Sequence, residues 1–340
     1  MEQNRINYFD AVKGFGIVLM IIGHFGVGLI NKFIYSFHMP LFFICSGYFL
    51  KPTNSIKELI VKKGKQLLVP YYFTCLCIVI GSIFNELIKG QSFSKVGYEI
   101  GQWLIASLYA SGNIEAFGIR RIGAIWFLWA LFIAILFFQA LNRYKQSSYL
   151  ILLIGFVGLF TGNQFWLPLS VQPAMTSLLF LYTGYILKQR KAFETDNLII
   201  YVFCTVLWLI CILTCDTNMA KNLYSHSILN VIGAIGGSFL IIKVCQLIEI
   251  KGWIPRIRRA FVFLGRNSLI ILCFHNIELN LINWNSVYNS FMGIGINRTI
   301  TYIICFIIKM LLLYFCVFIV HRFSWLRYIY SVPHSNAKHV

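Results

Sequence analysis

Apolar runs of about 20 residues recur along the whole chain and constrain its fold more than any other feature. A helix of that length crosses the roughly 30 Å hydrocarbon core of a bilayer. Backbone polar groups in lipid must be satisfied within the protein, which leaves helices and closed barrels as spanning structures. The runs are continuous and do not alternate between apolar and polar residues, so they favour helices. The sequence therefore predicts an all-α, polytopic membrane helix bundle.

Composition agrees with this class. Hydrophobic residues make up 59% of the 340 residues and charged residues 12%, whereas soluble domains carry about 25% charged residues. The net charge of +18 would suggest nucleic acid in a soluble protein. Here the charges lie in short loops between apolar runs, where a topology signal explains them. We therefore expect membrane lipids as partners and no nucleic acid.

Motifs for several other functions are missing from the sequence. The ten cysteines lie mostly inside apolar runs, where a thiol acts as a small apolar group. They include no CxxC pair, so neither a metal site nor a redox dithiol is expected. No Walker motif or GxGxxG precedes a helix, which argues against nucleotide hydrolysis and dinucleotide chemistry.

Ten spans are predicted from the apolar runs. They cover approximately residues 12–30, 34–50, 66–88, 124–141, 149–163, 171–187, 198–214, 227–248, 261–282 and 299–320. With the N-terminus in the cytoplasm, the inside segments hold 20 Lys and Arg residues and the outside segments hold seven. This is the asymmetry that the positive-inside rule requires. We therefore expect a multi-pass protein of the cytoplasmic membrane with both termini inside.

A single integral-membrane domain over residues 1–340 is expected, with no soluble domain and no cleavable signal peptide. The longest outside loop, 89–123, contains a stretch at 95–110 that predicts an amphipathic helix on the membrane surface. Such a helix would either cap the bundle or act as a lid over a substrate. The pattern leaves both alternatives open.

The first span carries three ionisable groups, and intramembrane ionisable groups are functional candidates by default. Asp10 and Lys13 are three residues apart, so they can pair on one helical face. His24 returns to within roughly 40° of that face, about 21 Å further along the axis. A lone histidine in a span could serve packing alone, but its alignment with the charged pair favours a functional role.

The second span begins with "FHMPLFF", in which Pro40 suits the first turn of a helix. His38 then lies just before the helix, where the positive end of the dipole disfavours an imidazolium. A neutral imidazole suits a general base or a hydrogen-bond donor to a carbonyl. The alternative is an interfacial histidine bonded to a loop carbonyl.

The ninth span adds a further group of polar residues. Ser268, His275 and Glu278 stand at offsets of seven and three, so they share one helical face. In the predicted topology the last two lie toward the outer side, as does Trp126 at the start of another span. The topology places five side chains at one depth: His24, His38, His275, Glu278 and Trp126.

A cluster of cations enters the third span from the cytoplasmic side. Lys62, Lys63 and Lys65 precede Pro70 in "KKGKQLLVPYY". The positive-inside rule explains most such clusters. The more specific interpretation is a phosphate-binding mouth for an anionic donor, assisted by Arg5.

Five stretches together resemble the acyltransferase 3 family of integral-membrane O-acyltransferases. They are "RINYFDAVKGFGIVLMIIGH" (5–24), "FHMPLFFICSGYF" (37–49), "KKGKQLLVPYY" (62–72), "AIWFL" (124–128) and "LGRNSLIILCFH" (264–275). They occur in family order across nearly the whole chain, and the first two are the most specific.

The resemblance implies transfer of an acetyl or other short acyl group from cytoplasmic acetyl-CoA or another acyl-CoA to a hydroxyl of a carbohydrate, often a surface glycan. It also implies a ten-helix bundle, the family histidine at His24, a basic residue at Arg5 and an acidic–basic pair at Asp10 and Lys13. There are departures. The family often has Arg where this chain has Lys13 and the lysines of 62–65, and Leu272 replaces a common Tyr. Lysine cannot make a bidentate phosphate contact, so a phosphate mouth here binds differently.

We therefore expect His24 to act as general base, supported by Asp10, with His38 or Trp126 stabilising the oxyanion. Arg5, Lys13 and the 62–65 lysines are expected to hold the donor, and Trp126, Ser268, His275 and Glu278 the acceptor. An acyl-histidine intermediate is a variant of the same mechanism. The alternative is a transporter or flippase for a polar or glycan substrate, although matching interrupted halves are not evident.

Overall fold

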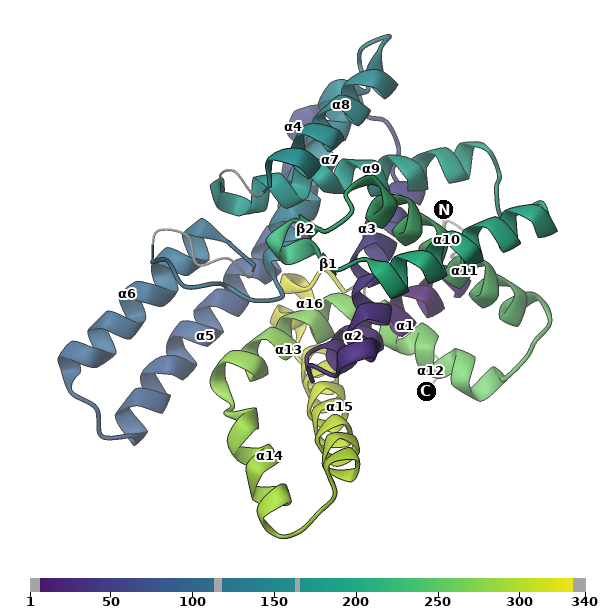
Figure 1. Cartoon of the computed structure of the whole chain (residues 1–340). Helices are drawn as coiled ribbons and strands as arrows, with labels where there is room; N and C mark the ends of the chain where they lie inside the picture. The colour runs from purple at the N-terminus through teal and green to yellow at the C-terminus, as the bar shows by residue number, and fades with distance from the viewer. Residues whose placement is uncertain (1–6, 113–117, 163–165, 333–340) are drawn as a thin grey trace.

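The computed structural model describes residues 7–112, 118–162 and 166–332 and is helical almost throughout. In the described residues, strand structure is confined to a short antiparallel pair, β1 (Thr217–Asn218) and β2 (Leu223–Tyr224). The predicted all-α class is therefore confirmed. Figure 1 shows α1, α2 and α3 near the centre, with the α5/α6 and α14/α15 pairs extending outward.

The helices follow the predicted spans closely. The first eight are α1 (Asn7–Gly23), α2 (Gly28–Tyr35), α3 (His38–Tyr48), α4 (Ile56–Lys63), α5 (Val69–Ile88), α6 (Phe93–Tyr109), α7 (Trp126–Leu141) and α8 (Ser147–Thr161). The next eight are α9 (Val171–Gln189), α10 (Leu198–Thr214), α11 (Ile228–Ile250), α12 (Pro255–Arg266), α13 (Ser268–Leu281), α14 (Trp284–Gly293), α15 (Arg298–Arg322) and α16 (Ser324–Ile329). Short turns are the π-helical η1 (Gly64–Leu68) and the 3-10 turns η2 (Pro168–Ser170) and η3 (Met219–Lys221).

Several apolar helices identify a membrane protein. Among the described residues, four helical segments are long and apolar enough to cross a bilayer: Gly28–Tyr48, Ile56–Ile88, Ile228–Ile250 and Arg298–Arg322. The pair α12 and α13 adds a fifth if it is counted as one span, and α7, α8 and α10 are shorter apolar helices. The ten-span count and the orientation stay predictions.

Two of the predicted spans are interrupted. The first ends at Gly23, and a turn with Gly26 at φ +72° separates it from α2, because glycine adopts this left-handed conformation without strain. The ninth, predicted over 261–282, breaks at Asn267 into helices bent by 72°. The Asn267 amide donates to the Phe263 carbonyl at 2.9 Å, so the side chain satisfies a backbone group near the break.

Glycines bring the central helices into backbone contact. A Cβ on Gly14 of α1 would lie 1.9 Å from the Phe261 carbonyl oxygen of α12, and one on Gly265 of α12 would lie 1.7 Å from the Asp10 carbonyl oxygen. Close approach of this kind is how helices associate where lipid surrounds them. It holds the N-terminal half of α1 against α12.

The amphipathic stretch predicted at 95–110 is a helix, α6. Ser92 caps its N-terminus by accepting from the Lys95 amide. Glu99 of this helix receives two hydrogen bonds from Arg120, at 2.6 and 3.2 Å. These bonds hold the pKa of the Glu99 carboxyl below its usual value. They also tie α6 to the segment 118–125, which borders the cavity described next.

Candidate active site between two adjoining cavities

A polar cavity of about 390 Å³ lies where the ends of several central helices meet. His24 enters it from the end of α1, His38 from the start of α3 and Trp126 from the start of α7. Asn276 and Asn280 of α13 complete one wall. The structure thus brings together three of the side chains that the sequence placed at one depth.

His24 lies one residue beyond the end of α1. Its side chain is exposed through the cavity. The hydroxyl of Tyr35 donates to the carbonyl of Gly23 at 2.9 Å, which fixes the backbone immediately before His24. Sequence reasoning missed Tyr35, although its position one helical turn before His38 was a usable signal.

His38 is the first residue of α3 and is 5% exposed. Its Nδ1 lies 3.0 Å from the carbonyl oxygen of Ile34. A carbonyl can only accept, so Nδ1 carries the proton and Nε2 holds a lone pair. The carbonyl contact expected of a packing histidine is therefore present, yet the same side chain lines the cavity. Its free acceptor nitrogen suits a base better than an oxyanion donor.

Trp126 and the two asparagines shape one wall of the polar cavity. The Trp126 ring packs on Gly112, where a Cβ would lie 2.5 Å from the ring. The Asn276 amide donates to the Ile122 carbonyl at 3.1 Å, and its Oδ1 has no partner among the described residues. Asn276 and Asn280 were missed from the sequence, although amides four residues apart on an apolar helix share one face.

His275 and Glu278 stand behind His24 and do not line the cavity. Both are buried, with 0% and 4% of their areas exposed. The His24 and His275 rings have centroids 5.0 Å apart, and His275 Nδ1 lies 2.7 Å from Glu278 Oε1. Lys309 of α15 contacts both carboxylate oxygens of Glu278, at 2.9 and 3.0 Å. This arrangement does not favour the acceptor-binding role expected for His275 and Glu278.

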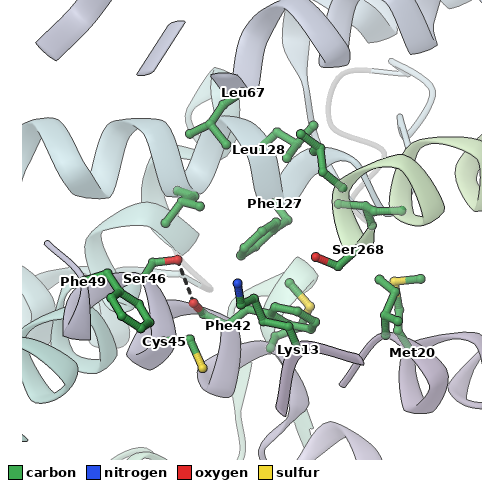
Figure 2. A pocket seen from close by; sticks show the side chains of 15 residues that line it. Lys13, Met20, Phe42, Cys45, Ser46, Phe49, Leu67, Phe127, Leu128 and Ser268 are labelled. Atoms are coloured by element: carbon green, nitrogen blue, oxygen red, sulfur yellow. Dashed lines mark hydrogen bonds between the residues drawn. The ribbon is translucent and has the colours of Figure 1, made fainter. Parts of the chain in front are cut away.

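A second cavity, of about 220 Å³, adjoins the first and is mostly apolar. Met20 and Met39 line both cavities, so the two spaces share a wall. Figure 2 shows the Lys13 amine and the Ser268 hydroxyl pointing into the second space. Ser268 therefore lies with Lys13 and apart from His275, unlike the grouping expected from the ninth span.

Asp10 belongs to the inner end of α1. It is 3% exposed, its Oδ1 lies 3.0 Å from Lys13 Nζ and its Oδ2 lies 3.4 Å from Arg266 Nε. The helix between Asp10 and His24 has a rise of about 1.5 Å per residue, which separates them by roughly 20 Å. Asp10 therefore orients Lys13 and does not reach the histidines.

The predicted lysine cluster lies beside the apolar cavity. Lys62 and Lys63 occupy the last turn of α4, and Lys65 lies in η1, the π-helical turn from which Leu67 lines that cavity. Lys63 Nζ donates to Gln66 Oε1 at 3.2 Å. Arg5, the other residue expected to bind the donor, lies outside the described residues. In the described part of the chain, no cluster of three or more His, Cys, Asp or Glu residues could hold a metal.

Comparisons with known proteins bear on the chemistry of this site. The family model of the acyltransferase domain (acyltransferase 3) matches residues 6–322. The nodulation protein NolL of Sinorhizobium fredii is 29% identical over 161 residues, which are 43% of this chain and 39% of NolL. NolL of Mesorhizobium japonicum is 26% identical over 242 residues, 66% of this chain and 59% of NolL. The chain thus matches less than two thirds of either relative, and no solved structure matches it significantly.

Proposed function

The chain belongs to the acyltransferase 3 family of membrane acyltransferases, and we propose that it transfers an acetyl or other short acyl group from a cytoplasmic acyl-CoA to a hydroxyl of a carbohydrate, such as a surface glycan. The observation that carries the proposal is the pair of adjoining cavities. One is apolar and contains an amine, and the other is polar and contains two histidines. A donor and an acceptor entering from opposite sides would meet at their shared wall.

The apolar cavity suits the donor. Of the described residues that line it, Lys13 is the one with a charged side chain. Asp10 orients that amine, and the exposed Lys62 and Lys65 lie beyond Leu67 on the same side. Amines bind phosphate as point charges, while apolar walls suit a narrow acyl-bearing arm. In this proposal Arg5 joins the cations that hold the donor phosphates.

The polar cavity suits the transfer step. His24 takes the proton of the acceptor hydroxyl as its oxygen bonds to the acyl carbon. The carbon–sulfur bond then breaks, and the thiolate receives a proton. General-base catalysis of this type contributes about 10²–10⁴-fold. His38, whose Nε2 is an acceptor, orients the hydroxyl, and the Trp126 indole N–H is available as a donor to the developing oxyanion.

The topology predicted from the positive-inside rule belongs to the same proposal. With the N-terminus of the multi-pass chain in the cytoplasm, Lys13 and the lysine cluster face the compartment that supplies acyl-CoA. The histidine cavity then opens toward the outer side. The described helices and the orientation are compatible with acceptors that are assembled at or beyond the membrane.

The test is acyl transfer by the purified protein in lipid nanodiscs. Wild-type protein given radiolabelled acetyl-CoA and extracted glycan should form an alkali-labile ester. The His24→Ala variant should not, while His226→Ala, which changes an exposed histidine outside both cavities, should match wild type. Mass spectrometry of surface glycans from cells with and without the gene would identify the acceptor. Export of a glycan without any turnover of acyl-CoA would indicate a transporter and overturn the proposal.

A further inference from the structure

A series of neighbouring charged and titratable side chains leads from the polar cavity to α15. It begins at His24, continues through His275 and Glu278 of α13, and ends at Lys309. Lys309 also sits over the Trp284 ring, 3.8 Å from its centroid. Glu278 and Lys309 are 4% and 3% exposed. An ion pair that is desolvated in this way costs free energy that apolar side chains would not, and intramembrane charges usually mark function.

The geometry of His275 indicates which of its ring nitrogens can exchange a proton with His24. Its Nδ1 lies 2.7 Å from the Glu278 carboxylate, at an angle outside the normal hydrogen-bond range, and a carboxylate partner requires a proton on that nitrogen. Its Nε2 is buried and has no partner among the described residues. The ring centroids of His24 and His275 are 5.0 Å apart and the ring planes are tilted by 58°, so the two imidazoles are direct neighbours.

We propose that His275, Glu278 and Lys309 are positioning residues that hold and return the proton taken by His24. This inference rests on the proposed acyl transfer. Lys309 contacts both carboxylate oxygens of Glu278 and holds them in place, and Glu278 orients His275 and stabilises its imidazolium. His275 Nε2 can then receive the proton that His24 has removed from the acceptor hydroxyl. When the carbon–sulfur bond breaks, the same proton returns through His24 to the thiolate, so no net proton is gained or lost.

Few other charged or titratable groups among the described residues face His275 and Glu278. α1 contributes His24, α3 contributes His38 and α15 contributes Lys309. α5 brings the ion pair of Glu86 and Lys89 to the outer end of α13, where Asn85 bonds to the Leu281 carbonyl. The opposite charges of Glu86 and Lys89 balance each other. Among the described residues, the charge in direct contact with His275 is therefore that of Glu278, whose carboxylate oxygens Lys309 contacts.

The test compares Glu278→Gln, Lys309→Met and the double variant E278Q/K309M in acyl-transfer assays. Each single change leaves one buried charge without its partner and lowers thermal stability. The double change removes both charges and should restore stability. If the pair serves proton transfer, kcat of the double variant stays roughly 10-fold to 100-fold below wild type, with the KM for acyl-CoA nearly unchanged.

The pH profile supplies a readout that a purely structural role would not move. The carboxylate favours protonation of the histidine pair, so its removal should shift the acid limb of kcat to lower pH. Glu278→Asp, which keeps the charge, should retain most activity. Asp196→Asn/Lys243→Met removes another ion pair with a buried lysine, on α11, and should leave the profile unchanged.

Recovery of wild-type kcat by E278Q/K309M would overturn the inference, as would an unshifted acid limb in folded E278Q. If the single variants do not fold, the double variant and E278D still decide the question. Either contrary result would leave the proposed function standing, provided that wild type transfers the acyl group and His24→Ala does not. Absence of transfer by wild-type protein would instead count against the proposed function itself.

Discussion

The two ends of α1 present different kinds of polar group. At the N-terminal end, Asp10 forms ion pairs with Lys13 and Arg266. At the C-terminal end, His24 and His38 face the polar cavity with ring nitrogens that can gain or lose a proton. The difference separates two tasks along one helix. Fixed charge suits binding of an anionic donor, and titratable nitrogen suits movement of a proton.

The largest effect is expected at the C-terminal end of α1. Replacing His24 with Ala should lower kcat for acyl transfer by about 10²–10⁴-fold, because the base that accepts the hydroxyl proton is lost. Binding of acyl-CoA should be unchanged, since the N-terminal end of α1 is untouched. Single-turnover kinetics together with calorimetric titration of acyl-CoA would measure the two separately. Loss of donor binding in His24→Ala would show that the two ends are not independent.

His38 provides a more specific test of the chemistry in the polar cavity. His38→Asn keeps a donor near the position of Nδ1, so the contact with the Ile34 carbonyl and thermal stability should survive. It removes Nε2, so kcat should fall by roughly 10-fold to 100-fold, at the lower end of general-base effects. Steady-state kinetics beside a melting curve would check both. A folded His38→Asn protein with full activity would reduce His38 to packing.

Changes at the N-terminal end of α1 should affect the affinity for acyl-CoA rather than the rate of transfer. Lys13→Gln removes the amine from the apolar cavity, and a charge-assisted hydrogen bond contributes about 1.5–3 kcal/mol, so the KM for acyl-CoA should rise about 10-fold or more. The kcat should change little. Lys13→Arg should recover binding, and Lys145→Gln, on the exposed α7–α8 connection, is the matched control. A variant that lost kcat at unchanged KM would place Lys13 in the chemistry.

The positions of most helices were accessible from the sequence because length and hydropathy dominate in lipid, while the ten-span arrangement stays a prediction. The grouping of His24, His38 and Trp126 followed from the depth of each residue in its span. Depth alone could not distinguish the side chains that line the cavity from those behind them. His275 is therefore buried where it was expected to contact substrate, and its partner Lys309 comes from a helix distant in the sequence.

Breaks within apolar runs were also hidden from the sequence. The stretches 261–264 and 269–273 on the two sides of Asn267 are both apolar, so a continuous ninth span was expected where two helices meet at 72°. That break starts α13 at Ser268 and puts this hydroxyl beside Lys13. A bend of this kind is set by tertiary packing against α1, through Gly14 and Gly265, which no local pattern reveals.

The smallest effect is expected from the ion pair of Glu99 and Arg120 near the polar cavity. The hydrogen bonds from Arg120 hold the pKa of Glu99 below its usual value, so the pair stabilises the fold above the ordinary pKa of Glu, about 4.3. That stabilisation is lost as the pH falls through the lowered folded value. Glu99→Gln should lower stability by at most about 1 kcal/mol at pH 7, with a smaller difference from wild type near pH 3.

Because Arg120 belongs to the segment bordering the polar cavity, Glu99→Gln should also raise the KM for the acceptor slightly, while the KM for acyl-CoA stays constant. Melting curves at both pH values and acceptor kinetics would measure this. A larger loss of kcat than of acceptor affinity would mean that a fixed charge near the polar cavity also takes part in the transfer step.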